Sequence, residues 1–352
     1  MVHTRKKAPT KKAGAAIIED LRKKGLITSG ADPSLHVRFV STGIPQIDDI
    51  MGGGIALDRV TMLVGLESAG KTLMSQKIAA SFQEQGLNVV LVDAEMAYDE
   101  RWWASTGVDI DELMVSRPPG GEPAVDVIIA LVGNVDLIII DSGAALVSVT
   151  EQDRDAQENA QIGSIARVHK KLFDRLIGRL SGSGTAVVLI NQLRADIGNP
   201  RPGSYTYPGG GAQKFWSSVI MRIRNAGTHD DGRDMGIQVI KNKVGVSGGN
   251  VVLPFKFDGS FDIITLVTAD ALDKNIIQHA GAWYRFPEAL LSFQIEDPIK
   301  PVMGTDLVQV MGRDALHRVF EEDEEAFAKL RAAVALRKGA DESVPELLEV
   351  EE

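Results

Sequence analysis

Short runs of apolar, often β-branched residues recur along the chain and do not alternate with polar residues. Four of them lie in the first 200 residues: Val60–Val64, Val89–Asp93, Leu137–Asp141 and Ala186–Asn191. Such runs are typical of strands buried on both faces of a sheet. Helical periodicity fills the gaps between them, at residues 72–85, 124–132 and 162–180. Alternating strands and helices predict an α/β fold with a mostly parallel central sheet flanked by helices.

The pattern changes on either side of this core. Three further apolar runs, separated by Gly and Asp turns, predict added antiparallel strands at Val219–Asn225, Met235–Val244 and Val251–Phe257. After Thr265 the pattern of apolar runs and helical stretches changes, which predicts a small C-terminal domain. Near the start, residues 13–23 have the pattern of an amphipathic helix too short to be stable alone. We therefore expect an N-terminal arm and helix, a core, a C-terminal domain and an acidic tail, at residues 1–35, 36–265, 266–340 and 341–352.

Composition is that of an ordinary folded protein, with 352 residues of which 44% are hydrophobic and 24% are charged. This excludes a wholly disordered or collagen-like chain. The chain has no Cys, which excludes disulfides, thiol nucleophiles and thiolate metal sites. The apolar runs are far shorter than the ~20 residues that cross a bilayer, and the basic N-terminus lacks the apolar stretch of a signal peptide. We expect a cytoplasmic protein without a membrane partner.

Charge is unevenly distributed within a formal net charge of −10. Residues 1–12 hold five basic residues and no acidic one, whereas residues 321–352 hold eleven acidic against four basic residues, a net −7. Such runs are usually solvated tails. Alternatively, the basic arm attracts polyanions and the acidic tail competes with them. Nucleic-acid binding stays open despite the negative sum, because counterion release depends on a local cluster of bases.

A phosphate-binding loop is the clearest chemical signal. Eight residues between a predicted strand and a predicted helix match G-x-x-x-x-G-K-[ST]: Gly65, Leu66, Glu67, Ser68, Ala69, Gly70, Lys71 and Thr72. In this pattern backbone N–H groups and the helix N-terminus surround phosphate oxygens, Lys71 reaches the outer phosphates, and the Thr72 hydroxyl ligates Mg²⁺. The sequence therefore predicts a nucleotide site rather than a chance Gly-rich turn.

Two carboxylates follow predicted core strands at the same edge of the sheet. Asp141 ends an apolar strand, where it would orient Mg²⁺ or its bound water; the alternative is a cap for the next helix. Glu95 would polarise a water for attack on the γ-phosphate; the alternative is a solvated loop carboxylate. Shortly afterwards, Trp102 and Trp103 are candidates either for stacking on an adenine or for core packing.

Together these motifs resemble the bacterial RecA recombinase family, including its phage-encoded relatives. The similar segments occur in family order: Ser41–Gly43, Gly65–Thr72, Asp93–Glu95, Gly107–Asp111, Val135–Asp141, Ile190–Gln192, Lys241–Lys243 and Ala280–Tyr284. Many ATPases share a phosphate-binding loop, whereas the Asp-Ala-Glu, Asn-Gln, Lys-Asn-Lys and Ala-Gly-Ala-Trp-Tyr segments are much more specific. The resemblance implies a RecA-type P-loop ATPase core with an N-terminal oligomerisation helix and a small α+β C-terminal domain.

The resemblance also implies roles at a site that takes ATP and Mg²⁺. The implied phosphate, Mg²⁺ and catalytic groups are Lys71, Thr72, Glu95 and Asp141, with Asp99 and Trp102 at the adenine and Gln192 as the sensor of the γ-phosphate. Lys241 and Lys243 correspond to lysines that reach the ATP of the neighbouring subunit, and Lys214 and Phe215 to residues of the same interface. Each site would be complete only with a neighbour, so hydrolysis would require assembly.

Two loops that follow the nucleotide strands match the family's DNA-binding loops, residues 148–161 and 193–211. The second has nineteen residues rich in Gly and Pro, too many for an idle connection in a compact domain. Its candidate contacts to phosphates and bases are Arg194, Arg201, Tyr205, Tyr207, Gly209, Gly210 and Gly211. Pro200 and Pro202 stand among residues that replace apolar family residues, and the first loop is acidic. Individual contacts therefore stay open, as does a mobile surface loop without a ligand.

The leading interpretation is a protein of DNA recombination and repair: an ATP-dependent recombinase that forms helical filaments on single-stranded DNA. It would pair that strand with a homologous duplex and hydrolyse ATP when DNA is bound, with single-strand-binding and mediator proteins as further partners. The alternative is a ring-forming helicase or DNA motor on the same core, against which Lys241–Lys243 and Ala280–Tyr284 speak. A third class, a regulator that binds ATP without hydrolysing it, conflicts with the complete set of predicted catalytic residues.

Overall fold

The computed structural model describes residues 11–148, 158–195, 205–228, 230, 232–292 and 298–336. The chain separates into two compact units, Met1–Arg38 and Phe39–Glu352. The first unit contains helix α1 (Lys11–Lys23) and a short 3-10 helix, η1 (Pro33–Leu35). Ile17 and Ile18 of α1 are exposed, so the apolar stripe predicted for this helix faces solvent within its own unit.

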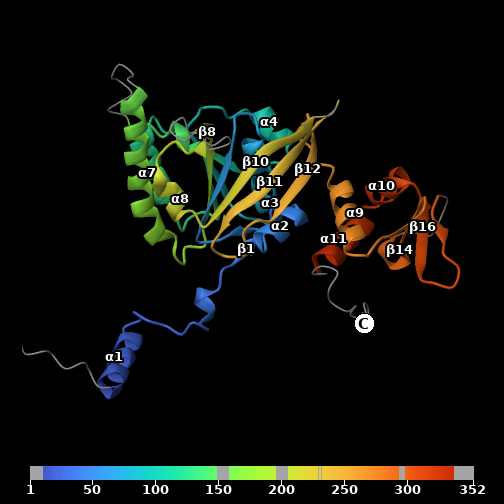
Figure 1. The fold of residues 1–352 in the computed structure, drawn as a ribbon, viewed down its shortest axis with the longest axis horizontal. Helices are drawn as coiled ribbons and strands as arrows, with labels where there is room; N and C mark the ends of the chain where they lie inside the picture. Colours follow the sequence, from blue (N-terminus) through green and yellow to red (C-terminus); the bar gives the residue numbers. More distant parts are fainter. Residues whose placement is uncertain are drawn as a thin grey trace, which may run out of the picture. The chain divides into compact units, whose positions relative to one another are not determined.

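An eight-stranded sheet forms the centre of the second unit, in the order β12-β11-β10-β3-β7-β6-β4-β5 (Figure 1). Its strands are β3 (Val60–Gly65), β4 (Val89–Asp93), β5 (Leu113–Ser116), β6 (Leu137–Asp141), β7 (Ala186–Gln192), β10 (Val219–Thr228), β11 (Gly232–Asn242) and β12 (Asn250–Lys256). The neighbouring pairs from β10 through β5 are parallel, whereas β10-β11 and β11-β12 are antiparallel. The prediction of an α/β fold with a mostly parallel central sheet is confirmed.

Helices cover both faces of this sheet. They are α2 (Pro45–Met51), α3 (Lys71–Glu84), α4 (Glu100–Ser105), α5 (Gly121–Leu131), α7 (Glu158–Leu180) and α8 (Gly211–Trp216), of which α8 lies beside α7 (Figure 1). Leu63 and Ile139 point to the face covered by α2, α3 and α4, and their neighbours Met62 and Ile140 point to the face covered by α5 and α7. Because both faces are buried, the strands have no polar alternation in sequence.

A third hydrophobic cluster lies in the C-terminal part of the chain, between residues 267 and 334. Its elements are α9 (Ile263–Asp273), β13 (Gln278–Ala280), β14 (Trp283–Pro287), η3 (Glu288–Leu290), β15 (Lys300–Pro301), β16 (Leu307–Met311), α10 (Arg313–Glu322) and α11 (Glu324–Leu336). The strands form an antiparallel sheet in the order β13-β14-β16-β15. Helix α11 begins with two acidic residues, Glu324 and Glu325, and its face with Ala326, Leu330 and Val334 is buried.

The remaining elements are short: β1 (Phe39–Val40), β2 (Ile55–Ala56), η2 (Gly143–Ala145), β8 (Arg194–Ala195) and β9 (Tyr205–Thr206). Such segments carry too few residues for a periodic signal, and sequence reasoning also missed β5, α2 and α4 for this reason. Among the described helices, none has both the length and the apolar character needed to span a membrane.

Candidate nucleotide site and DNA-binding loops

The phosphate-binding loop connects the carboxyl end of β3 to the amino end of α3, as its sequence predicts. Gly65 ends the strand pressed against β10: a Cβ here would lie 2.4 Å from the carbonyl oxygen of Ile223. Only glycine allows this approach without moving β10. The loop and the positive end of α3 therefore lie at the carboxyl edge of the parallel strands, where ligands bind in folds of this class.

Lys71, the first residue of α3, is buried beside the loop. Its Nζ donates a hydrogen bond to the carbonyl oxygen of Leu66 at 2.7 Å. Burial lowers the pKa of the ammonium group, and the carboxylates of Asp141, Glu95 and Glu67 oppose that shift. A buried cation beside the backbone N–H groups of this loop suits the β- and γ-phosphates of a nucleotide.

Thr72 and Asp141 form the second part of the site. The Thr72 hydroxyl donates to Oδ2 of Asp141 across 2.9 Å. Asp141 is 8% exposed. Burial raises the pKa of its carboxyl to about 6 against the hydrogen bond from Thr72, and the charge of Glu95 adds to the rise. Mg²⁺ takes one or two protein oxygens and completes its octahedron with phosphate and water oxygens, so this hydroxyl and carboxylate fit that ion.

Glu95 lies at the same edge because β4 and β6 are neighbours, with Asp93 opposite Asp141. The backbone N–H groups of Ala94 and Glu95 donate to the carbonyl oxygen of Asp141, at 2.7 and 3.1 Å. The Ser142 hydroxyl donates to Oε1 of Glu95. Glu95 stays exposed while it is held next to Asp141, a placement that leaves its carboxylate accessible to a water.

Arg117 supports the segment that carries Glu95, and sequence reasoning missed it. The buried carboxylate of Asp93 accepts from Nε of Arg117 at 3.0 Å and from the backbone N–H groups of Ala97 and Tyr98, at 3.0 and 3.2 Å. Arg117 also donates to the carbonyl oxygen of Tyr98 at 3.2 Å. Arg117 follows β5, a strand without a clear sequence signal, so its meeting with Asp93 is visible only in the folded chain.

The structure distinguishes the two tryptophans. Trp103 is buried in the core, whereas Trp102 is 39% exposed. With its amide oxygen turned toward them, Gln76 of α3 accepts from Nε1 of both, each at 3.2 Å. Asp99 caps α4 by accepting from the backbone N–H of Trp102 at 2.9 Å. Core packing is therefore the role of Trp103, and the adenine contact of Asp99 and Trp102 stays a prediction.

The second loop begins directly beside the phosphate-binding loop. Gln192, at the end of β7, lies opposite Gly65 of β3, and the backbone N–H of Leu193 donates to the carbonyl oxygen of Gly65 at 2.9 Å. The two ends of the loop meet in the pair β8-β9, where Arg194 lies opposite Thr206. One hydrogen bond thus connects the backbone of Gly65 directly to the start of this loop.

The return segment of the loop packs on the core. The guanidinium of Arg222 lies 4.9 Å from the centre of the Tyr205 ring. Tyr207 is partly buried, and burial raises the pKa of its hydroxyl. Part of each predicted stacking surface is therefore used in packing. Other predicted segments lie outside the described residues: Arg201 with residues 196–204, most of the first loop (149–157), the basic arm (1–10) and the end of the chain (337–352).

Lys214, Phe215, Lys241 and Lys243 form one group on the surface. Nζ of Lys241 donates to the carbonyl oxygens of Lys214 and Phe215, at 2.5 and 3.1 Å, and Nζ of Lys243 donates to that of Phe215 at 2.9 Å. Partial burial, together with the charges of Lys243 and Lys214, lowers the pKa of Lys241 to about 8. Phe215 is 67% exposed.

This group lies away from the phosphate-binding loop of its own chain. Lys241 pairs with Ile220, which pairs with Met62 in the middle of β3, whereas the loop begins beyond Gly65. At about 3.3 Å per residue, that is about 10 Å along the strand, with two strand spacings of about 4.8 Å across. Lys241 is therefore not placed to reach phosphates held by its own Lys71.

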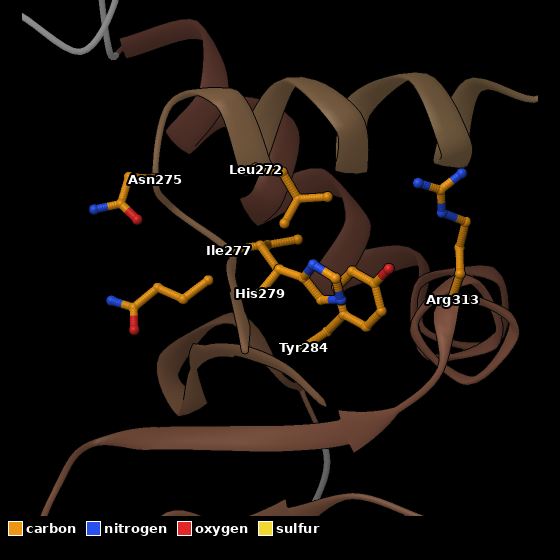
Figure 2. A pocket seen from close by; sticks show the side chains of 7 residues that line it. Leu272, Asn275, Ile277, His279, Tyr284 and Arg313 are labelled. Carbon is orange, nitrogen blue, oxygen red and sulfur yellow. The ribbon is translucent and has the colours of Figure 1, made fainter. Parts of the chain in front are cut away.

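A separate hollow of about 480 Å³ lies in the C-terminal part of the chain (Figure 2). The rings of His279 and Tyr284 stack there with centroids 4.4 Å apart, and Arg313 lines the same hollow. None of the predicted ATP or loop residues that the structure describes belongs to it.

Comparison with known proteins agrees with this geometry. A family model described as the RecA N-terminal domain matches residues 10–265. Among curated proteins, Protein RecA of Fusobacterium nucleatum is 36% identical over 294 residues, which cover 80% of this chain and 76% of that protein. Protein RecA of Chlorobaculum parvum is 33% identical over 90% of both chains, and that of Chlorobaculum tepidum is 34% identical over 82% of this chain and 87% of its own.

The family model covers the core, and the match to the protein of Chlorobaculum parvum, which covers 90% of this chain, continues beyond it. They confirm the recombinase interpretation and do not favour the ring helicase. The chain therefore belongs to the bacterial RecA family of recombinases.

Proposed function

We propose that the chain is a DNA-dependent ATPase that assembles as a filament on single-stranded DNA and pairs that strand with a homologous duplex. ATP is the substrate and Mg²⁺ its cofactor. Membership of the RecA family supports this function, and the edge of the sheet that carries the phosphate-binding loop supports its chemistry.

The observation that carries the proposal is the convergence of four strand ends at one edge, those of β3, β7, β4 and β6. Gly65 lies opposite Gln192, and Asp93 lies opposite Asp141, so the loop, the γ-phosphate sensor and both carboxylates belong to one site. Gln192 also begins the second DNA-binding loop. A single edge thus combines groups for phosphate binding, groups for hydrolysis and a connection to DNA.

Within this site each residue has a separate task. The backbone N–H groups of the loop and the ammonium of Lys71 bind the outer phosphates and stabilise charge that develops on them. Glu95 accepts a hydrogen bond from the attacking water and orients it. Thr72 and Asp141 would hold Mg²⁺, which would supply neutralisation of the phosphate charge. Gln192 senses the γ-phosphate at the end of β7.

Lys241 and Lys243 act on the ATP of an adjacent copy. Their distance from the phosphate-binding loop of their own chain supports this assignment, as does the exposure of Phe215 beside them. Two ammonium groups supplied by a neighbour take the part that an arginine finger plays in other ATPases. Hydrolysis then requires assembly, which single-stranded DNA promotes.

The test is the rate of ATP hydrolysis with and without single-stranded DNA, together with negative-stain electron microscopy. We expect strong stimulation by DNA, helical filaments with a non-hydrolysable ATP analogue, and strand exchange with a homologous duplex. Glu95→Gln serves as the control, because it preserves shape but cannot orient the water as a carboxylate does. Closed rings without filaments, or turnover that DNA does not change, would contradict the proposal.

A further inference from the structure

His169 occupies an unusual position in the core. It lies in α7 with 0% exposure, and its ring is tilted against Phe173 with centroids 6.4 Å apart. Its Nε2 lies 2.8 Å from the carbonyl oxygen of Gly143 and donates to it. Its Nδ1 has no hydrogen-bond partner among the described residues. Burial lowers the pKa of the imidazole, so the ring is neutral, with its proton on Nε2.

The imidazole fills the space between two glycines that are far apart in sequence. A Cβ on Gly143 would lie 2.9 Å from Cε1 of His169, and a Cβ on Gly209 would lie 2.7 Å from its Nδ1. The backbone of Gly209 has φ +93°, which a residue with a side chain rarely adopts. Neither segment can therefore move toward the other without displacing the ring.

One of these segments belongs to the proposed ATP site and the other to the second DNA-binding loop. Gly143 follows Asp141 and Ser142, and Ser142 donates to Glu95 in the ATP site. Gly209 closes the second DNA-binding loop.

The end of this loop is itself anchored in the core. The carbonyl oxygen of Pro208 accepts from Nδ2 of Asn191 at 3.0 Å and from Nε2 of Gln213. Asn191 also donates to Oε1 of Gln213 at 2.5 Å, and both side chains are fully buried. The residue before Gly209 is thus held to the end of β7, next to Gln192.

We propose that His169 is a positioning residue that couples the ATP site to the second DNA-binding loop by holding Gly143 and Gly209 at a fixed separation. This inference rests on the proposed function. An apolar side chain would fill the same volume without burying an imidazole nitrogen that lacks a partner, which costs stability. What the histidine adds is one directed hydrogen bond to Gly143, the first residue of η2 after β6, and a rigid ring against the loop.

The test measures coupling rather than activity alone. The dissociation constant of a fluorescent single-stranded oligonucleotide is measured with and without a non-hydrolysable ATP analogue, and the ratio of the two values is the coupling factor. Values of about 5–150 are typical of coupled sites. Binding of the analogue without DNA is measured separately. The full chain is used as wild type, His169→Met, His169→Gln and the control Phe173→Leu, one helical turn further along α7.

We expect His169→Met to bind the analogue as wild type does in the absence of DNA, and to lose most of the coupling factor. His169→Gln should restore it, because a glutamine amide can donate to the Gly143 carbonyl oxygen, and Phe173→Leu should keep it. Thermal unfolding is followed for each variant. Should His169→Met fail to fold, His169→Asn replaces it, because its amide is too short to reach that oxygen.

A normal coupling factor in the variant without the donor would overturn the inference. So would an equal loss of both DNA affinities, which indicates damage to packing alone, or a failure of His169→Gln to restore coupling. If wild type itself shows no DNA binding or no effect of the analogue, the proposed function fails, and this inference fails with it.

Discussion

The hydroxyl of Thr72 donates a hydrogen bond to Oδ2 of Asp141 across 2.9 Å, joining the start of α3 to the end of β6. This contact places a buried carboxylate where a cation would bind. The raised pKa of Asp141 follows from the same burial, so the residue proposed to hold Mg²⁺ also destabilises the nucleotide-free fold at neutral pH.

Replacing Asp141 by Asn should abolish ATP hydrolysis and stabilise the nucleotide-free protein at pH 7. The folded-state pKa of about 6 lies above the value of about 3.9 for an unfolded chain, so the folded state binds more protons between these values. The free energy of unfolding therefore falls as pH rises through that window. At pH 7, removing the charge should restore about 1–3 kcal/mol of it. Urea unfolding at pH 7 and at pH 4.5 measures this gain, which should be smaller at the lower pH. An equal gain at both would contradict it.

A shared site predicts complementation between two inactive variants. Lys71→Ala lacks the lysine proposed to bind the phosphates, and Lys241→Met lacks the ammonium group proposed to act on the ATP of the neighbour. In a filament of equal parts, about a quarter of the interfaces combine an intact Lys71 with an intact Lys241 from the adjacent copy. We expect DNA-stimulated turnover to recover toward that fraction of wild type.

The matched control for that mixture is Lys71→Ala mixed with a chain that carries both substitutions, in which no interface is complete. Nucleotide binding to unassembled Lys241→Met should stay within about twofold of wild type, since Lys241 is not part of that half of the site. Mixtures that remain as inactive as their parents would place both lysines in one chain's site.

Replacing Arg117 by Ala should lower kcat more than it weakens ATP binding. The change removes one of three donors to the buried Asp93, which loosens the segment that carries Glu95. A buried carboxylate with a lost donor costs about 1–3 kcal/mol of stability. Urea unfolding and steady-state kinetics report the two effects. Arg101→Ala, on the exposed start of α4, is the control, and equal behaviour of the two variants would remove Arg117 from this role.

Replacing Gly65 by Ala should disrupt the phosphate-binding loop, because the added Cβ would lie 2.4 Å from the carbonyl oxygen of Ile223. We expect ATP binding to weaken by at least about tenfold, since misplaced backbone N–H groups no longer meet the phosphates. Isothermal titration with a non-hydrolysable analogue measures it. Gly178→Ala in α7, where nothing lies within 4 Å of the new Cβ, should bind normally and be slightly more stable. Normal binding of the analogue by Gly65→Ala would show that β10 can move to make room for the added Cβ.

The sequence by itself determined those features of this protein that depend on residues close together along the chain. The parallel strands read as apolar runs because both faces are buried, and Gly65–Thr72 is a continuous motif, so strand, loop and helix were predicted together. Asp141 and Glu95 were placed at the same edge because parallel strands end on the same side of a sheet.

Only the tertiary structure decided the contacts between residues that no periodicity links. Arg117 meets Asp93 through β5, an edge strand too short to predict, and His169 reaches both Gly143 and Gly209 from the middle of a long helix. The separation of Lys241 from its own phosphate-binding loop follows from strand register, which sequence pattern does not specify across different strands. Such contacts arise from packing of the whole sheet and its helices. The pattern of apolar and polar residues along the sequence does not specify them.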